Sequence, residues 1–302
     1  MNPSLNLSTL IAQSAQQLDA AHTAGSLSFG QGTTNAADEA AWLVLWALGL
    51  PLDTDVSDDA FNVELTSEQV AKAQALIAQR ISSRKPAAYL TQEAWLQGVS
   101  FYIDERAIVP RSLIAEVLAE GNIDPWLDPN TTRVLDLCTG NGSLGILAAL
   151  AFPDITVQGL DLSTDALAVA HINIERYGLE GRMTLAESDG LAKADGVFDL
   201  ILCNPPYVNA QSMTELPTEF KAEPALALAG GDDGMHFIRQ MLRDAPAHMS
   251  ENAVLVLEIG HERVYFETAF PNLDVVWLST SAGDDQVLLL TRQAIAESAF
   301  TK

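Results

Sequence analysis

Hydrophobic positions in the first part of the chain recur at helical spacing. A first predicted helix has apolar residues that recur at helical spacing: Leu7, Leu10, Ile11, Ala15 and Leu18. A second predicted helix covers residues 38–48 and carries two tryptophans on one face. A third begins at Thr66, where Gln69 supplies a capping-box pattern, and runs to about residue 82. These patterns predict a small helical domain over residues 1–87.

The pattern changes after residue 87. Short alternating runs around Gly98, between residues 88 and 109, predict a small β-hairpin. A helix is predicted over residues 112–120, and the turn-rich stretch 124–130 follows it. We therefore expect residues 88–130 to form a hairpin and a connecting segment.

From residue 131 onward, short apolar runs alternate with helical patterns. Strands are predicted at residues 134–138, 156–160, 183–186, 198–203 and 254–259, and helices at residues 143–151, 163–177, 235–249 and shortly after Gly260. This alternation predicts an α/β domain over residues 131–302, with a parallel sheet covered by helices on both faces. No helix separates the last two predicted strands, 275–278 and 286–290, so we expect an antiparallel hairpin at the sheet edge.

The composition and the net charge indicate which kind of partner the chain can bind. Hydrophobic residues make up 48% of the chain, and the formal net charge is −24. This charge opposes an affinity based on nucleic-acid phosphates and favours a basic protein partner. Residues 1–95 hold 4 basic and 10 acidic side chains, and residues 96–302 hold 12 and 30, so both parts are acidic.

Cysteine and apolar patterns indicate the compartment. Cys138 and Cys203 stand apart in apolar runs, as expected for reduced core residues, and neither they nor the scattered histidines predict a metal site. The first ten residues lack a signal pattern, and the apolar run 40–52 is too short to cross a membrane. We expect a cytoplasmic protein without a membrane partner.

A glycine-rich loop follows the first predicted strand of the sheet, in Val-Leu-Asp-Leu-Cys-Thr-Gly-Asn-Gly-Ser-Leu-Gly at residues 134–145. Gly140 and Gly142 allow the backbone to approach a ligand closely, and the start of the next helix adds free N–H groups. The same pattern also fits a nicotinamide- or flavin-binding turn, or a tight turn without a ligand.

Two acidic residues follow the next two strands. Asp161 lies 21 positions after Gly140, where a carboxylate can accept both hydroxyls of a ribose; it could instead begin a helix cap with Ser163. Asp189 follows the third strand and could accept from an adenine amine, or could be an ordinary loop aspartate.

The motif Asn204-Pro205-Pro206-Tyr207 directly follows the fourth strand of the parallel set. Proline has no N–H, so the carbonyls of this segment are available as acceptors. The Asn204 side-chain oxygen and the Pro205 carbonyl could hold both N–H groups of a planar amide or arylamine, with Tyr207 as an aromatic wall. This predicts methylation of such a nitrogen from a sulfonium donor, without a strong base. The long loop over residues 204–233, with four prolines, is predicted to cover the acceptor.

From about Arg84 onward, the chain resembles the S-adenosylmethionine-dependent protein-glutamine methyltransferases of the HemK-like group. The resemblance rests on Tyr89-Leu90, Phe101, Val109-Pro110-Arg111, Asp136 to Gly142, Asp161, Asn204 to Tyr207, Glu223-Pro224-Ala225-Leu226-Ala227-Leu228, Gly230-Gly231-Asp232-Asp233-Gly234 and Glu258-Ile259-Gly260. It implies a Rossmann-like seven-stranded methyltransferase domain, preceded by a small helical domain.

The resemblance also implies the site residues. The catalytic residues would be Asn204, Pro205, Pro206 and Tyr207, which would hold the acceptor glutamine amide. The residues around S-adenosylmethionine would be Asp136, Cys138, Thr139, Gly140, Asn141, Gly142, Asp161, Asp189 and Asn204. Two positions depart from the family: Cys138 stands where glycine is frequent, and Gly190 stands where some members have a tryptophan near the adenine.

Within this group, three segments resemble the PrmB branch, whose substrate is a large-subunit ribosomal protein of the uL3 type. They are residues 109–116, 89–91 and 283–287. The release-factor branch usually continues Pro-Arg with an acid and a threonine, which are absent here. The resemblance implies transfer of a methyl group to a glutamine amide nitrogen of a basic ribosomal protein. The net charge of −24 predicts that the chain does not bind nucleic acid stably.

Alternative functions stay open at this point. Glutamine methylation of release factors uses the same chemistry. A nucleic-acid adenine methyltransferase could use the same motif, but the net charge of −24 and the absence of a basic recognition region oppose it. A nicotinamide oxidoreductase leaves Asn-Pro-Pro-Tyr unexplained, and a ribosome assembly factor is a non-enzymatic alternative.

Overall fold

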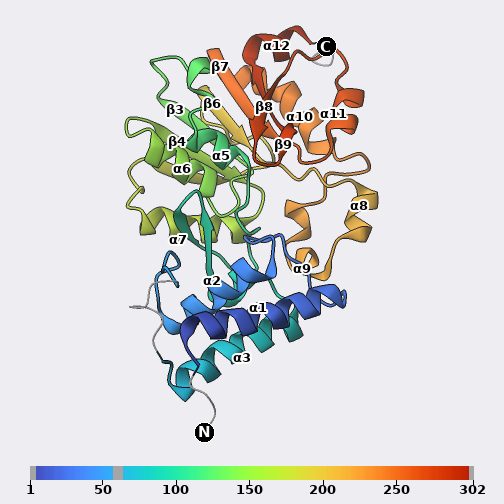
Figure 1. The fold of residues 1–302 in the computed structure, drawn as a ribbon. Coiled ribbons are helices and arrows are strands. Elements are labelled where there is room, and N and C mark those ends of the chain that lie inside the picture. Colours follow the sequence, from blue (N-terminus) through green and yellow to red (C-terminus); the bar gives the residue numbers. More distant parts are fainter. Residues whose placement is uncertain (1–4, 57–63, 299–302) are drawn as a thin grey trace. The chain divides into compact units, whose positions relative to one another are not determined.

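The computed structural model describes residues 5–56 and 64–298 (Figure 1). The chain divides into two compact units. The first unit consists of Met1–Ala94 together with the short segment Pro217–Ala222, and the second consists of Trp95–Leu216 and Glu223–Lys302.

The first unit is helical. Its helices are α1 (Leu7–Thr23), α2 (Ala36–Leu48), α3 (Ser67–Ser83), α4 (Ala87–Thr91) and α9 (Thr218–Lys221). Helices α1, α2 and α3 pack against one another (Figure 1). The predicted capping box of α3 is confirmed: Thr66 accepts from the backbone N–H of Gln69, whose side chain accepts in return from the N–H of Thr66.

A small hairpin lies where the first unit ends. Strands β1 (Glu93–Leu96) and β2 (Val99–Tyr102) form a two-stranded sheet, with a turn at Gly98, as the sequence predicts. The predicted start of the hairpin at residue 88 is wrong, because residues 87–91 form helix α4. Pro86 precedes this helix, and a proline without an N–H begins a short helix more readily than a paired strand.

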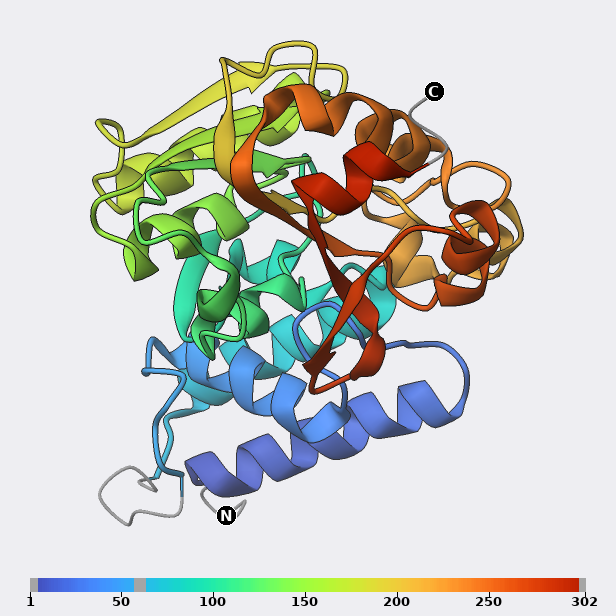
Figure 2. The same cartoon turned by 90° about the horizontal axis from the view of Figure 1, so that it is seen from above.

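The second unit contains a seven-stranded sheet. Its strands are β3 (Arg133–Leu137), β4 (Thr156–Asp161), β5 (Met183–Glu187), β6 (Phe198–Cys203), β7 (Met249–Glu258), β8 (Val276–Thr280) and β9 (Gly283–Thr291). Their order is β5-β4-β3-β6-β7-β9-β8. The first five strands in this order are parallel, and β9 is antiparallel to both β7 and β8. The predicted α/β class with an antiparallel edge hairpin is confirmed (Figure 2).

The helices of this unit are α5 (Ile114–Ala119), α6 (Ser143–Ala151), α7 (Thr164–Arg176), α8 (Ala210–Glu215), α10 (His236–Asp244), α11 (Arg263–Ala269) and α12 (Arg292–Glu297). The described part of this unit also contains three 3₁₀ turns: η1 (Asp124–Trp126), η2 (Ala225–Ala227) and η3 (Ala245–His248). The single helix predicted over residues 235–249 is wrong. Helix α10 ends at Asp244, because Pro246 cannot donate the next helical hydrogen bond.

Both faces of the sheet are buried. Val134, Leu200 and Val254 belong to one apolar cluster, and the residues that follow them, Leu135, Ile201 and Leu255, belong to the other. Successive side chains of a strand point to opposite faces, so the two clusters lie on the two sides of the sheet. This arrangement leaves the carboxyl ends of the strands as the place for polar groups.

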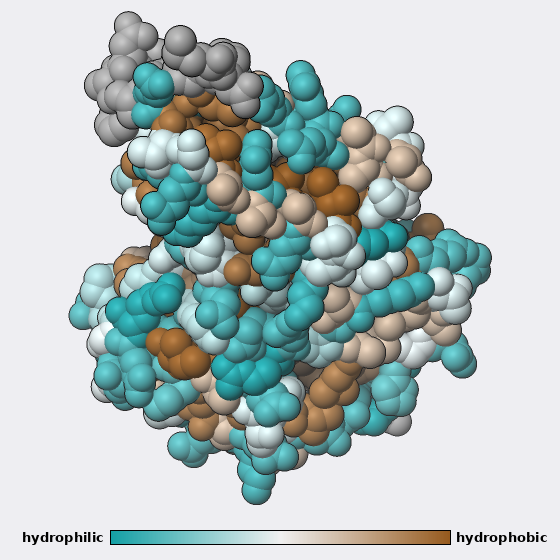
Figure 3. All heavy atoms as spheres, turned by 90° about the horizontal axis from the view of Figure 1, so that it is seen from below, coloured by the Kyte–Doolittle hydropathy of each residue, from teal (hydrophilic) through white to brown (hydrophobic). Residues whose placement is uncertain are grey.

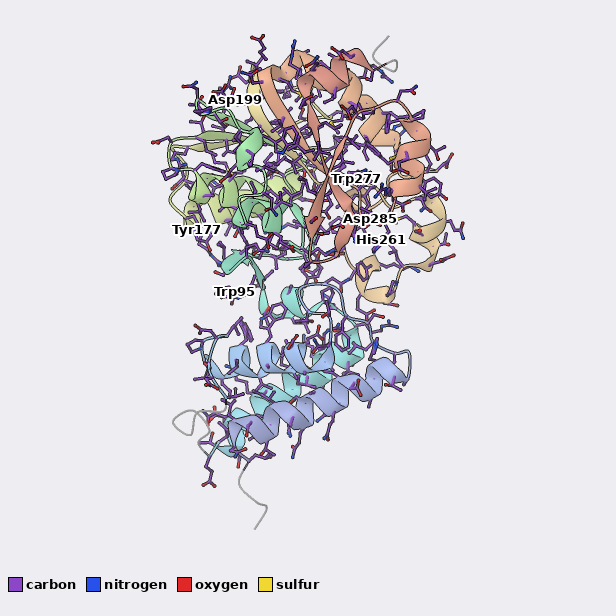
Figure 4. The ribbon with its side chains drawn as sticks, turned by 45° about the horizontal axis from the view of Figure 1, so that its top comes forward. Trp95, Tyr177, Asp199, His261, Trp277 and Asp285 are labelled. Carbon is purple, nitrogen blue, oxygen red and sulfur yellow. The ribbon has the colours of Figure 1, made fainter. Side chains whose placement is uncertain are left out.

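The opposite end of β6 is fixed by an acid. Asp199, labelled in Figure 4, accepts the backbone N–H groups of Thr132 and Arg133, each at 3.0 Å, and the hydroxyl of Ser250 at 2.8 Å. Tyr177, also labelled, donates its hydroxyl to the Ser100 carbonyl at 2.5 Å and joins the end of α7 to β2. These bonds fix the frame that carries the loops at the carboxyl ends.

On the face drawn in Figure 3, brown hydrophobic areas are interrupted by teal hydrophilic ones. Within the described ranges, we find no helix with the length and hydrophobicity needed to cross a membrane.

Candidate functional site

The glycine-rich loop joins β3 to α6 and has an unusual backbone. Cys138, Gly140 and Gly142 all have left-handed conformations, with φ of 60°, 54° and 83°. The Thr139 N–H donates to the carbonyl of Leu160 at 2.9 Å, which ties the loop to the end of β4. The predicted strand, glycine loop and helix are thus confirmed, and the loop lies where the order of the sheet strands reverses.

Asp136 at the end of β3 is buried under this loop. Its Oδ2 accepts the Thr139 hydroxyl at 2.5 Å and the Gly145 N–H at 2.8 Å. Among the described residues, its Oδ1 has no hydrogen-bond partner. Burial raises the pKa of Asp136 to about 6, so this carboxyl holds a proton more tightly than a free one.

This shift makes the stability pH-dependent in a defined direction. The native state binds the Asp136 proton more tightly than the unfolded state does, so this group lowers the free energy of unfolding as the pH rises from about 4 to about 6. Two pKa units correspond to about 3 kcal/mol. We expect Asp136→Asn to remove this part of the pH dependence, measured by urea unfolding without a ligand at pH 4, 5, 6 and 7. Identical pH dependence in the two proteins would contradict the assignment.

Asn141, within the loop, presents a second unsatisfied atom. It is buried, and its Nδ2 has no hydrogen-bond partner in the part of the chain that the structure describes. Its backbone carbonyl accepts from Asn173 Nδ2 at 3.0 Å, and Asn173 also bonds both the N–H and the carbonyl of Tyr102. Asn173 is fully buried on α7. This anchor was not predicted from the sequence, although an amide on the apolar side of a predicted helix is a signal for such a residue.

The two unsatisfied atoms suit the amino-acid end of a ligand. Asp136 Oδ1 is an acceptor that can satisfy an ammonium group, and Asn141 Nδ2 is a donor that can satisfy a carboxylate. A buried polar atom without a partner is costly, so such atoms mark places where a bound group contributes affinity. The residues therefore fit the methionine part of S-adenosylmethionine.

Asp161 at the end of β4 joins two loops. Its Oδ2 accepts the Gly140 N–H and its Oδ1 accepts the Ser163 N–H, both at 2.8 Å. Burial raises the pKa of Asp161 above its ordinary value. The helix cap is the neighbouring Ser163, whose hydroxyl accepts the Ala166 N–H at 3.1 Å. Asp161 therefore does more than begin a cap, and its carboxylate oxygens keep further lone pairs for ligand hydroxyls.

The third strand end brings Asp189 into the same region. Asp189 is exposed, and the preceding Ser188 donates its N–H to the Asp161 carbonyl at 2.8 Å. Gly190 is buried. A Cβ atom at this position would lie 3.9 Å from the ring of Phe237 of α10. An aromatic ring near this position thus comes from α10. Phe237 was not predicted from the sequence as a site residue, because the only signal there is the helical pattern over residues 235–249.

The Asn-Pro-Pro-Tyr segment begins beside the glycine-rich loop. Cys203 pairs in register with Leu137, so Asn204 and Cys138 follow neighbouring positions of adjacent strands. The side-chain amide of Asn204 is half-buried and makes no hydrogen bond to any described residue. Pro205 is buried. The predicted site for the methyl donor and the predicted site for the methyl acceptor therefore lie next to each other, at the carboxyl ends of β3 and β6.

The two cysteines meet at this junction. Both are free, and the Cys138 thiol hydrogen-bonds with Cys203. This hydrogen bond, together with burial, raises the pKa of Cys138 well above its ordinary value. Cys138 is therefore a neutral thiol and not a nucleophile.

Tyr207 is held by the buried carboxyl of Glu258, whose role was not predicted from the sequence. Its hydroxyl donates to Glu258 Oε1 at 3.2 Å, while Oε2 accepts the Ser112 hydroxyl at 2.6 Å and the Leu113 N–H at 2.9 Å. Burial raises the pKa of Glu258, and burial with the nearby Glu258 raises the pKa of Tyr207 well above its usual range. Tyr207 is therefore a neutral phenol that can form a wall but cannot act as a base.

Three glycines enclose Tyr207. A Cβ atom at Gly230 would lie 2.7 Å from the Tyr207 backbone, and one at Gly260 would lie 2.6 Å from its ring. A Cβ atom at Gly234, whose φ is 77°, would overlap the Tyr207 carbonyl oxygen. The glycine-containing segments named by the resemblance therefore leave room for Tyr207.

An ion pair fixes the later part of the loop that covers residues 204–233. Arg111 binds Glu223 through two hydrogen bonds of 2.6 and 2.8 Å, and Glu223 also accepts the Val109 N–H at 3.0 Å. Glu223 is buried, and a bidentate pair of this kind defines the relative position of the two segments. The resemblance named both segments, but only the structure shows that they bind each other.

Known proteins are similar to this chain over most of its length. Residues 122–233 match the family described as "Methyltransferase small domain". A Bordetella pertussis protein named "Ribosomal protein uL3 glutamine methyltransferase" is 50% identical over 96% of both chains. Proteins of the same name from Burkholderia pseudomallei and Neisseria meningitidis are 49% and 47% identical, over 87% and 89% of this chain and 88% of each relative.

Solved structures show a similarity as well. A methyltransferase from Pyrococcus furiosus superposes with a TM-score of 0.47 at 18% identity, over 74% of this chain and 98% of its own.

Proposed function

Because the chain belongs to the family of ribosomal protein uL3 glutamine methyltransferases, we propose that it transfers a methyl group from S-adenosylmethionine to the side-chain amide nitrogen of a glutamine in uL3. The observation that carries this proposal is the unbonded amide of Asn204, which directly follows β6 and lies next to the glycine-rich loop.

The sulfonium group of bound S-adenosylmethionine supplies an electrophilic methyl. The Asn204 side-chain oxygen and the Pro205 carbonyl accept the two N–H groups of the glutamine amide and direct its nitrogen toward that methyl. Nitrogen gains a bond to carbon as the carbon–sulfur bond breaks, and one N–H proton then leaves to solvent. The two acceptors stabilise the positive charge that develops on nitrogen, so a strong base is unnecessary.

Glutamine, with its planar amide, suits the walls of this site. Tyr207 presents an aromatic ring that Glu258 and the surrounding glycines hold in place. The phenol hydroxyl donates to Glu258, so it does not compete with the amide N–H groups for the acceptors. These features favour a flat, neutral acceptor over an amine such as lysine, whose charged form donates in three directions.

The net charge of −24 supports a basic protein as the substrate. Ribosomal proteins bind RNA phosphates and are accordingly basic, so the field of this chain attracts them. We place the reaction in the cytoplasm, where ribosomal proteins are synthesised.

The test is transfer of labelled methyl to purified uL3, to mature large subunits and to a release factor. We expect the highest kcat/KM for free uL3 and a decrease of roughly tenfold between 50 and 300 mM salt, since long-range attraction is screened. Affinity for S-adenosylmethionine, measured at both salt concentrations, is the control. A higher kcat/KM for the release factor would overturn the substrate assignment.

A further inference from the structure

The loop that follows Tyr207 passes through the helical unit. The chain leaves the second unit after Leu216 and returns to it at Glu223, and Pro217–Ala222 between them belongs to the first unit. This segment includes the short helix α9, so six residues of the acceptor loop are part of another folded unit.

Glu219 fixes this segment within the helical unit. Its side chain is completely buried and accepts two hydrogen bonds from Arg84, at 2.9 and 2.8 Å, and the Ser28 N–H at 3.0 Å. Arg80 Nη1 lies 3.7 Å from the same carboxylate. A buried acid with this many donors is held in one geometry.

The surroundings of Glu219 balance its charge. Arg80 donates from Nε to Glu39 at 2.9 Å and from Nη2 to the Ser28 carbonyl at 2.8 Å, and Glu39 also accepts the Thr33 hydroxyl at 3.0 Å. Two arginines and two glutamates thus form one neutral cluster. Removing one charge from it leaves an opposite charge without its partner, which is costly in a buried site.

Packing supports the same attachment. Phe220, next to Glu219, lies against Gly30, where a Cβ atom would be 2.9 Å from the Phe220 ring. The φ of Gly30 is 130°, a conformation that favours glycine. The helical unit therefore has a site shaped for this segment.

The parts of the loop on either side are fixed in the second unit. Asn209 donates to Glu262 at 2.8 Å, and Glu223 binds Arg111. The loop that follows the acceptor motif is therefore attached to the second unit at Asn209 and Glu223 and to the helical unit at Glu219. We propose that Glu219 is a positioning residue for the protein substrate: by attaching residues 217–222 to the helical unit, it restricts the motion of the loop that follows the acceptor motif. This proposal rests on the proposed function.

Glu219→Gln tests this role, because glutamine keeps the shape and removes the charge. We expect the KM for uL3 to rise about tenfold, while kcat changes less than threefold and the S-adenosylmethionine dissociation constant less than twofold. Hydrogen–deuterium exchange of the enzyme alone should increase in residues 208–216 and 223–229. Glu215→Gln, an exposed change on α8 in the same loop, is the matched control and should leave all four quantities unchanged.

Arg84→Lys is the second variant, in case Glu219→Gln disrupts the helical unit. Arg84 is partly exposed. Lysine at this position keeps the positive charge but loses the bidentate hydrogen bond to Glu219. We expect the same changes, smaller in size. Unchanged exchange, or raised exchange with an unchanged KM, would overturn the proposal. If the wild-type chain methylated no uL3, the proposed function would fail, while the exchange result would still show whether Glu219 holds the loop.

Discussion

Asn204→Ala is expected to lower kcat for methyl transfer by about 10³-fold and to change the affinity for S-adenosylmethionine by less than fivefold. The variant loses the oxygen that both orients the amide and faces the developing positive charge. Loss of one preorganised group at a developing charge costs about 10²–10³ in rate, and loss of orientation adds to it. The half-buried Asn204 amide makes no hydrogen bond to any described residue, so the change should not disturb the fold.

Single-turnover transfer to uL3 measures the rate, and calorimetry measures cofactor binding. Asn272→Ala, which changes an exposed asparagine in a turn before β8, is the matched control and should retain full activity. An Asn204→Ala enzyme with more than a third of the wild-type kcat would rule out the proposed orientation of the glutamine amide.

Asp161→Ala is expected to raise the dissociation constant of S-adenosylmethionine by about 100-fold. The variant loses the acceptor for the ribose hydroxyls, and it also releases the N–H groups of Gly140 and Ser163 that the carboxylate holds. Hydrogen bonds to a charged group contribute about 1.5–3 kcal/mol each, and loss of one or two of them accounts for this change.

Glu187→Gln is the control for this variant. Glu187 pairs in register with Asp161 on the neighbouring strand, yet it is exposed and accepts no hydrogen bond from the glycine-rich loop. Calorimetry should give a wild-type dissociation constant for Glu187→Gln. A dissociation constant within threefold of wild type for Asp161→Ala would show that the carboxylate does not bind the cofactor.

The backbone segments that form the site, and their position next to each other, could be predicted from the sequence. Residues 134–145 and 204–207 follow two strands that are adjacent in a parallel sheet, and such strands place their carboxyl ends together. The position of Asp161 follows from the same rule. These predictions depend on local patterns and on sheet topology, which the alternation of strands and helices already specifies.

The supporting contacts could not be predicted in this way. Ser112 and Glu258 are 146 positions apart, and only the three-dimensional fold brings them to Tyr207. The attachment of Glu219 to the helical unit has no sequence signal either, because an acid in a proline-rich loop is normally solvated. Long-range pairs of polar side chains depend on the packing of whole elements.

The errors at two helices have a local cause. Pro86 begins a helix where alternation suggested a strand, and Pro246 ends a helix that apolar spacing suggested would continue. In both places, the missing N–H of proline decides the backbone while the hydrophobic pattern gives no warning.

Tandem mass spectrometry of uL3, after reaction with the purified enzyme and S-adenosylmethionine, tests the proposed function by identifying the side chain that carries the added methyl group. We predict one added methyl group of about 14 Da on a glutamine side chain, absent when the enzyme carries Asn204→Ala. A methyl group on lysine, on arginine or on the protein terminus, or an unmodified uL3 beside a methylated release factor, would contradict the proposed function.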